Sequence, residues 1–65
     1  MNVPTAAELA DLAAQCERAA TRADANATAW ASTHPEHAAR ARQKAGLYRA
    51  DAATYRAGRI PEEEQ

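Results

Sequence analysis

The sequence predicts an all-α protein: an antiparallel two-helix hairpin with helices at about residues 5–31 and 34–57. Three observations support this fold class. Alanine, the residue with the highest intrinsic helix propensity, makes up 20 of the 30 hydrophobic residues. The three prolines stand at the ends of the two segments and between them, where no helix has to continue. No segment alternates apolar and polar residues beside a hairpin turn, so we expect no strands.

The first helix has a clear start and a clear end. Thr5 and Glu8 have the spacing of a capping box, in which the threonine hydroxyl accepts from the backbone of the glutamate and the glutamate side chain accepts in return. Pro35 disfavours helical geometry at His34 and therefore ends the first segment. Nothing between these points breaks a helix.

The second helix can start in two ways. Thr33 and Glu36 match a second capping box, whereas His34 as N-cap would make Pro35 the first helical residue, a position that proline favours. Both starts stay open at this stage.

Gly58 is placed to supply a left-handed C-cap, and Pro61 prevents the second helix from continuing. We expect a single domain over residues 1–65, with a short flexible start at 1–4 and an acidic tail at 59–65.

Apolar residues three and four positions apart form a seam on each predicted helix. When the chain folds at the turn, the two seams face each other, and large residues mostly meet small ones. We expect Trp30, beside the turn, to close this core. The predicted intra-hairpin core consists of Leu9, Leu12, Cys16, Ala19, Ala23 and Trp30 from the first helix and Ala41, Ala45, Tyr48, Ala52 and Tyr55 from the second.

The opposite face of the second helix carries small residues where a solvated face would normally carry charged ones. A domain of this size is marginally stable alone, and small residues let a further helix approach closely. We therefore predict a homodimeric four-helix bundle. The alternative is that these alanines only supply helix propensity. The predicted oligomer or partner interface is Ala39, Gly46, Ala50, Ala53 and Ala57.

Nothing in the sequence predicts catalysis, a cofactor or a metal site. His34 and His37 lie at the turn, but Cys16 is several turns away, so a set of three or four zinc ligands is lacking. No nucleophile–base arrangement and no glycine-rich phosphate loop is present. The single cysteine excludes an intramolecular disulfide, and we expect it to act as a small buried apolar group.

Basic residues are concentrated in the second helix although the net charge is -1. Arg42, Arg49 and Arg56 recur every seven residues and form one stripe, and Arg40 is a fourth candidate contact residue. One hypothesis is that they pair with acids of the first helix, as at the edges of a coiled coil. The other is that these four arginines contact the phosphates of a nucleic acid.

We therefore predict a small non-catalytic protein that oligomerises and binds a macromolecular partner, with another protein favoured over RNA or DNA. An adaptor or regulator of a bacterium, phage or plasmid fits the alanine and arginine usage. The sequence has no apolar run long enough to span a bilayer and no secretory signal pattern, so we expect a cytoplasmic protein that binds neither membranes nor small-molecule substrates.

Two resemblances add alternatives. Trp30-Ala31-Ser32 resembles the Trp-x-Gly turn of small helical hairpins exported by a specialised bacterial secretion system, with Ser32 in place of glycine, and this implies a secreted hairpin. Neither Tyr48 nor Tyr55 has an acid four residues later, so the export signal of that family is absent. The length and topology resemble the repressor-of-primer type of plasmid regulator, which implies an RNA-binding dimer.

Overall fold

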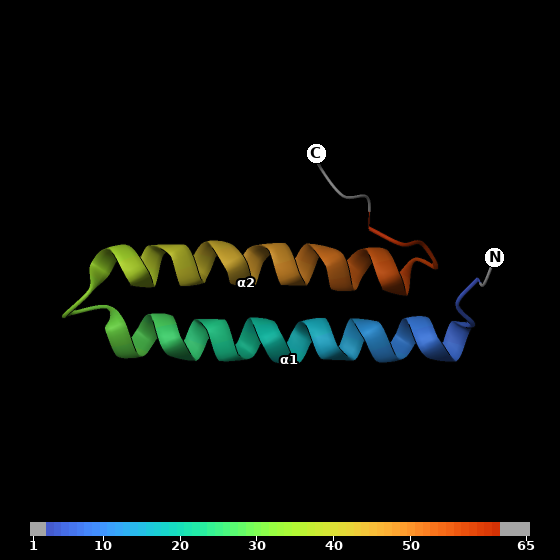
Figure 1. The fold of residues 1–65 in the computed structure, drawn as a ribbon, viewed down its shortest axis with the longest axis horizontal. Coiled ribbons are helices and arrows are strands. Elements are labelled where there is room, and N and C mark those ends of the chain that lie inside the picture. The colour runs from blue at the N-terminus through green and yellow to red at the C-terminus, as the bar shows by residue number, and fades with distance from the viewer. Residues whose placement is uncertain (1–2, 62–65) are drawn as a thin grey trace.

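Two antiparallel helices joined by a short turn make up the fold (Figure 1). The computed structural model describes residues 3–61, and its dimensions are 46 × 25 × 16 Å. α1 spans Ala6–Trp30 and α2 spans Pro35–Arg56. The predicted all-α hairpin is confirmed, and each helix end lies one residue inside its predicted bound. Parts of the expected flexible start and acidic tail, at positions 1–2 and 62–65, lie outside the described residues.

The two helix starts use different chemistry. At α1 the predicted capping box forms: the Glu8 amide donates to the Thr5 hydroxyl at 3.1 Å, and the Thr5 amide donates to the Glu8 carboxylate at 2.8 Å. At α2 the N-cap is His34, with Pro35 at the first helical position and no side-chain cap. The second capping box is therefore not formed, because proline already fixes the backbone of the first helical turn.

The C-terminus of α2 ends in a Schellman motif. Gly58 has a φ of +84°, which is accessible to glycine at little cost. Its amide donates to the Tyr55 carbonyl at 3.0 Å, and the Arg59 amide donates to the Thr54 carbonyl at 3.1 Å. The glycine predicted as a C-cap is confirmed.

The core between the helices consists of alanine alone. Within residues 3–61, every fully buried hydrophobic residue is an alanine, at 0–9% exposure. Most of them recur every seven residues, which keeps them on one line along each helix. Since each carries a single methyl group, the two backbones pack closely along these lines. The buried residues are Ala13, Ala20, Ala23 and Ala27 of α1 and Ala38, Ala45 and Ala52 of α2.

The predicted core is therefore rotated relative to the observed one. Of its members, Ala23, Ala45 and Ala52 are buried, and Ala23 and Ala45 share one cluster as the predicted pairing requires. Trp30 does not close the core: it is 45% exposed. The physical reason is that the helices approach along the alanine lines, which leave no room for large side chains. The remaining predicted members are half-buried beside the contact: Leu9, Leu12, Cys16, Ala19, Ala41, Tyr48 and Tyr55.

Candidate interaction surface

One flank of the hairpin is closed by ion pairs between the helices. The guanidinium of Arg49 donates to Asp24, and that of Arg56 donates to Glu17. The hydrogen bond between Arg56 and Glu17 lowers the pKa of the Glu17 carboxyl and raises the pKa of the arginine. These side chains are about half exposed, so the pairs contribute little to stability but fix which flank is polar.

Two of the four arginines considered for phosphate contacts thus have carboxylate partners within the chain. Arg49 and Arg56 meet acids of α1, which is the first of the two hypotheses for this stripe. Arg40 lies elsewhere: it lines a groove near the turn on the other flank. Arg42 is exposed on α2. The four therefore do not form one continuous phosphate-binding row.

The other flank is apolar. On α1, Leu9, Leu12, Cys16 and Ala19 follow one another at spacings of three and four residues, so they share a side of the helix. This side is turned away from Glu17 and Asp24, which lie on the polar flank. We call this side of the hairpin the apolar face, and its members are the seven half-buried residues Leu9, Leu12, Cys16, Ala19, Ala41, Tyr48 and Tyr55.

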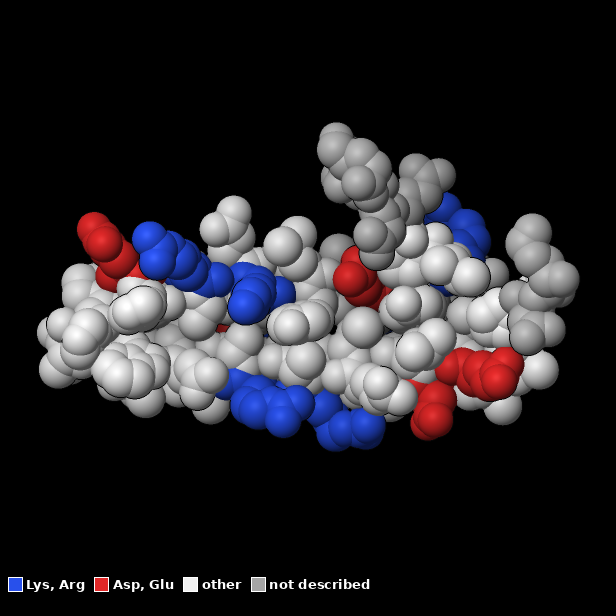
Figure 2. Space-filling view, viewed as in Figure 1, with Lys and Arg blue, Asp and Glu red and all other residues white. Residues whose placement is uncertain are grey.

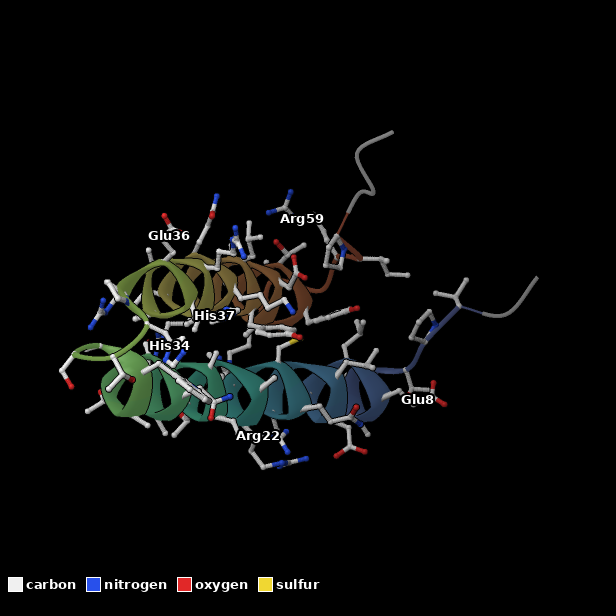
Figure 3. All side chains as sticks on the ribbon, turned by 60° about the vertical axis from the view of Figure 1, so that its left-hand side comes forward. Glu8, Arg22, His34, Glu36, His37 and Arg59 are labelled. Carbon is white, nitrogen blue, oxygen red and sulfur yellow. The ribbon has the colours of Figure 1, made fainter. Side chains whose placement is uncertain are left out.

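A groove of about 540 Å³ opens on this flank near the turn. The ring of Trp30 meets His34 edge-on with ring centroids 4.7 Å apart, and the His37 ring lies 6.1 Å from it. Arg40 and Lys44 of α2 line the same groove and make it basic. Figure 3 shows both histidines between the two helices at the turn. Trp30 therefore packs on imidazole rings rather than between the helices. Among the described residues lining this groove, none is acidic.

The opposite end of the hairpin, where α1 begins and α2 ends, carries more acidic groups, and we call it the terminal end. A shallow groove of about 380 Å³ there is lined by Val3, Pro4, Glu8, Asp11, Leu12 and Gln15. Figure 2 looks onto the apolar flank: basic side chains lie over the turn half and the middle, acidic ones lie at the turn, over α2 and at the terminal end, and a further basic group lies at the upper edge of the terminal end. Figure 3 places Glu8 at the end far from His34 and His37.

Cys16 is half-buried on the apolar face. Desolvation raises the pKa of its thiol, and the nearby carboxylate of Asp51 raises it further. A raised pKa keeps the sulfur protonated at neutral pH, which suppresses its nucleophilicity. Cys16 therefore behaves as a small apolar group of the apolar face, with the charge of Asp51 as the smaller cause of its raised pKa.

The predicted small-residue face of α2 is exposed throughout. Gly46 has nothing within 4 Å of the position that a Cβ would take, so no neighbouring group crowds this side of the helix. It lies away from the half-buried residues of the apolar face. Its members are Ala39, Gly46, Ala50, Ala53 and Ala57.

Within residues 3–61, no group of three or more histidine, cysteine and acidic side chains is arranged to hold a metal ion. His34 and His37 come together with 5.7 Å between ring centroids, but Cys16 does not join them. In the same part of the chain, neither helix is long and apolar enough to cross a lipid bilayer.

Sequence reasoning missed two charged residues on the apolar flank. Lys44 lines the groove near the turn, and the charge of Asp51 raises the pKa of the Cys16 thiol. The signal was present in the spacing: Lys44 lies four residues before Tyr48 and Asp51 three residues after it, so all three share one side of α2.

Comparison with protein-family models gave no match, and neither curated proteins nor solved structures showed significant similarity to the chain.

Proposed function

We propose that this hairpin is a non-catalytic interaction protein whose working form is a homodimer, a four-helix bundle made by packing two apolar faces together. The bundle then presents its outer helix surfaces to a macromolecular partner, for which another protein is favoured. The observation that carries the proposal is the half-burial of Leu12, Tyr48 and Tyr55 on one flank, beside a core whose fully buried members, within residues 3–61, are all alanines.

The energetics of a lone hairpin support assembly. A buried methyl group contributes roughly 0.8 kcal/mol, so seven alanines form a weak core. Leu12, Tyr48 and Tyr55 retain exposed apolar surface that a second copy would cover. Small domains commonly reach adequate stability through oligomerisation when their own core is thin.

The size of the face also suits a second copy. Helices of 25 and 22 residues are about 33–38 Å long at ~1.5 Å per residue. With a width of two helices, about 18–20 Å, each face covers roughly 600–750 Å². Two such faces bury about 1,200–1,500 Å² in total, which lies at the lower end of the range for specific protein–protein interfaces, ~1,200–2,000 Å².

The apolar face is preferred over the small-residue face of α2 because it has more apolar surface to bury. Alanines at positions such as Ala50 and Ala53 offer one exposed methyl group each, whereas Leu12, Tyr48 and Tyr55 are larger side chains, each of which keeps part of its surface exposed. We therefore assign the small-residue face to the outside of the bundle.

Light scattering after size exclusion tests the dimer. We expect a mass of about 14 kDa, twice the 7.0 kDa of the chain, at micromolar concentration. Leu12→Glu, which places a charge on the apolar face, should shift the mass toward the monomer. Ala50→Glu, a matched charge on the small-residue face, should leave the dimer intact, and helix content measured by circular dichroism controls for folding.

Two results would overturn the proposal. A 7.0 kDa species that unfolds cooperatively, with a midpoint independent of protein concentration, would show that the hairpin is sufficient alone. Dissociation by Ala50→Glu but not by Leu12→Glu would move the interface to the small-residue face.

A further inference from the structure

The apolar flank has opposite charges at its two ends, and this restricts how two copies can meet. At the turn, Arg40 and Lys44 stand beside the rings of Trp30, His34 and His37. Cationic side chains next to aromatic rings make this end a surface for acidic and apolar groups.

The terminal end of the hairpin, where α1 begins and α2 ends, supplies acidic and apolar groups. Glu8, Asp11 and Leu12 line the groove there, and the Asp51 carboxylate lies on the same flank, close enough to Cys16 to raise the pKa of the thiol. This end therefore carries three acidic side chains around an apolar leucine, with Arg59 beside Asp51. The two ends of one hairpin are complementary, although they lie too far apart to meet within one chain.

A symmetric face-to-face dimer has two orientations in which all neighbouring helices run antiparallel. In the first, both turns lie at the same end of the bundle, which gathers the basic groups of both copies at one end and the acidic groups at the other. In the second, the turns lie at opposite ends, and the basic groove of each copy meets the acidic end of its partner. Like charges repel across an interface, so the second orientation is favoured.

The spacing along α2 fits the second orientation. Lys44 and Asp51 are seven residues apart, about 10 Å along the helix, on the same side as Tyr48. A two-fold axis that crosses α2 between Leu47 and Tyr48 places each Lys44 opposite the partner copy's carboxylate at position 51. That crossing point is close to the middle of α2 and level with the middle of α1, so the two apolar faces overlap along nearly their whole length.

From this geometry we infer that the dimer is antiparallel, with the turns at opposite ends and with the Trp30–His34–His37 groove of each copy occupied by the terminal end of the other. The inference rests on the proposed homodimer and specifies its arrangement. Lys44 and Asp51 form an ion pair between copies, made twice by symmetry, and Tyr48 packs near its own symmetry mate.

The distance between the two turns tests the arrangement. A spin label at Ser32→Cys, in a Cys16→Ala background, reports this distance by pulsed electron paramagnetic resonance. The antiparallel dimer predicts about 40 Å, since the labels are separated by ~26 helical rises of ~1.5 Å. A dimer with both turns at one end predicts less than about 20 Å, the width of a four-helix bundle, and would overturn the inference alone.

Absence of any dipolar coupling together with a monomer mass would instead reject the proposed dimer. If nucleic acid copurifies with that monomer, seen as an absorbance at 260 nm above that at 280 nm, the groove with its basic and aromatic residues binds nucleic acid. Both proposals are then wrong.

A charge exchange supplies the second readout. Lys44→Glu and Asp51→Lys should each raise the dimer dissociation constant by about 10-fold, because symmetry duplicates every lost pair. The double variant should return to within about 2-fold of the original value. Gln43→Glu, which adds an acid on the outer side of α2, is the matched control and should change it by less than about 2-fold. Single variants that match this control, or a double variant that is no tighter than the singles, would overturn the Lys44–Asp51 pair.

Discussion

Substitution of Ala45 by leucine tests the central structural claim, which is that the two helices meet along lines of alanine. Ala45 has no exposed surface, and it clusters with Ala20 and Ala23 across the helix contact while Tyr48 packs against the cluster. Leucine adds three carbon atoms at the point of closest approach. They fit only if the helices separate or the side chain adopts a strained rotamer, and overpacking of this kind costs about 1–3 kcal/mol.

The expected change is large for a protein of this size. In domains of 60–100 residues, 1 kcal/mol shifts the melting temperature by about 4–8 °C, so Ala45→Leu should lower Tm by roughly 5–20 °C. Thermal and urea unfolding, followed by circular dichroism at matched protein concentration, measure the loss. Matched concentrations are essential because the midpoint of the dimer that we propose depends on protein concentration.

Ala25→Leu is the control, because Ala25 is exposed on α1 and leucine is also a strong helix former. Its effect on the free energy of unfolding should stay within about 0.5 kcal/mol. If Ala45→Leu is as stable as Ala25→Leu, or more stable than the original protein, the helices do not approach along Ala45 and the core described above is wrong.

Three further outcomes follow from the structure. Gly58→Ala should destabilise by about 1 kcal/mol because of its left-handed φ of +84°, whereas Gly46→Ala, in an open helical position, should stabilise by about 0.5–1 kcal/mol; urea unfolding measures both, and equal effects would contradict the C-cap. Asp51→Asn should lower the pKa of the Cys16 thiol and speed its alkylation near pH 8 by roughly 2- to 5-fold. An unchanged rate would show that the charge of Asp51 does not act on the thiol. Arg56 lowers the folded-state pKa of Glu17, so the contribution of Glu17 to stability is present above its unfolded pKa and is lost as the pH falls through its folded pKa. Glu17→Gln should therefore reduce the loss of stability at acid pH. An unchanged loss would show that the Glu17–Arg56 pair does not stabilise the fold.

The helix boundaries could be predicted from the sequence because each depends on a few neighbouring residues. The Thr5–Glu8 box and the glycine at position 58 act through local hydrogen bonds and backbone geometry, and both appear as expected. Only the start of α2 had two local solutions. There, Pro35 at the first helical position prevailed over the threonine cap.

The rotation of each helix about its own axis was harder to predict. Hydrophobicity ranks Leu12, Tyr48 and Trp30 above any alanine, so a search for the most apolar stripe places them in the core. The structure places Ala13 and Ala20 there instead, since close approach of two backbones selects for side-chain size and not for hydrophobicity. The seven-residue spacing of alanine on both helices, rather than the leucine and aromatic pattern, was the informative signal.

The charged residues of the apolar flank, Lys44 and Asp51, were not predicted for a related reason. The predicted core shares only Ala23, Ala45 and Ala52 with the observed one, so the prediction gave the charged residues different neighbours and named the arginine stripe but not Lys44 or Asp51. Once the alanine lines fix the rotation, Arg49 and Arg56 fall beside the acids of α1, and Lys44 and Asp51 fall on the opposite flank.

The alanine core and the apolar face are consequences of one arrangement. Helices that approach along alanines have no space for leucine or tyrosine between them, so the heptad neighbours of those alanines project from the two flanks. One flank carries charges that pair within the hairpin, and the other carries Leu12, Tyr48 and Tyr55. The sequence predicts that large residues meet small ones inside one hairpin. In the structure, the small residues lie between the helices and the large ones lie on the flanks. In the bundle that we propose, small residues fill the space within each hairpin and large residues fill the space between the two.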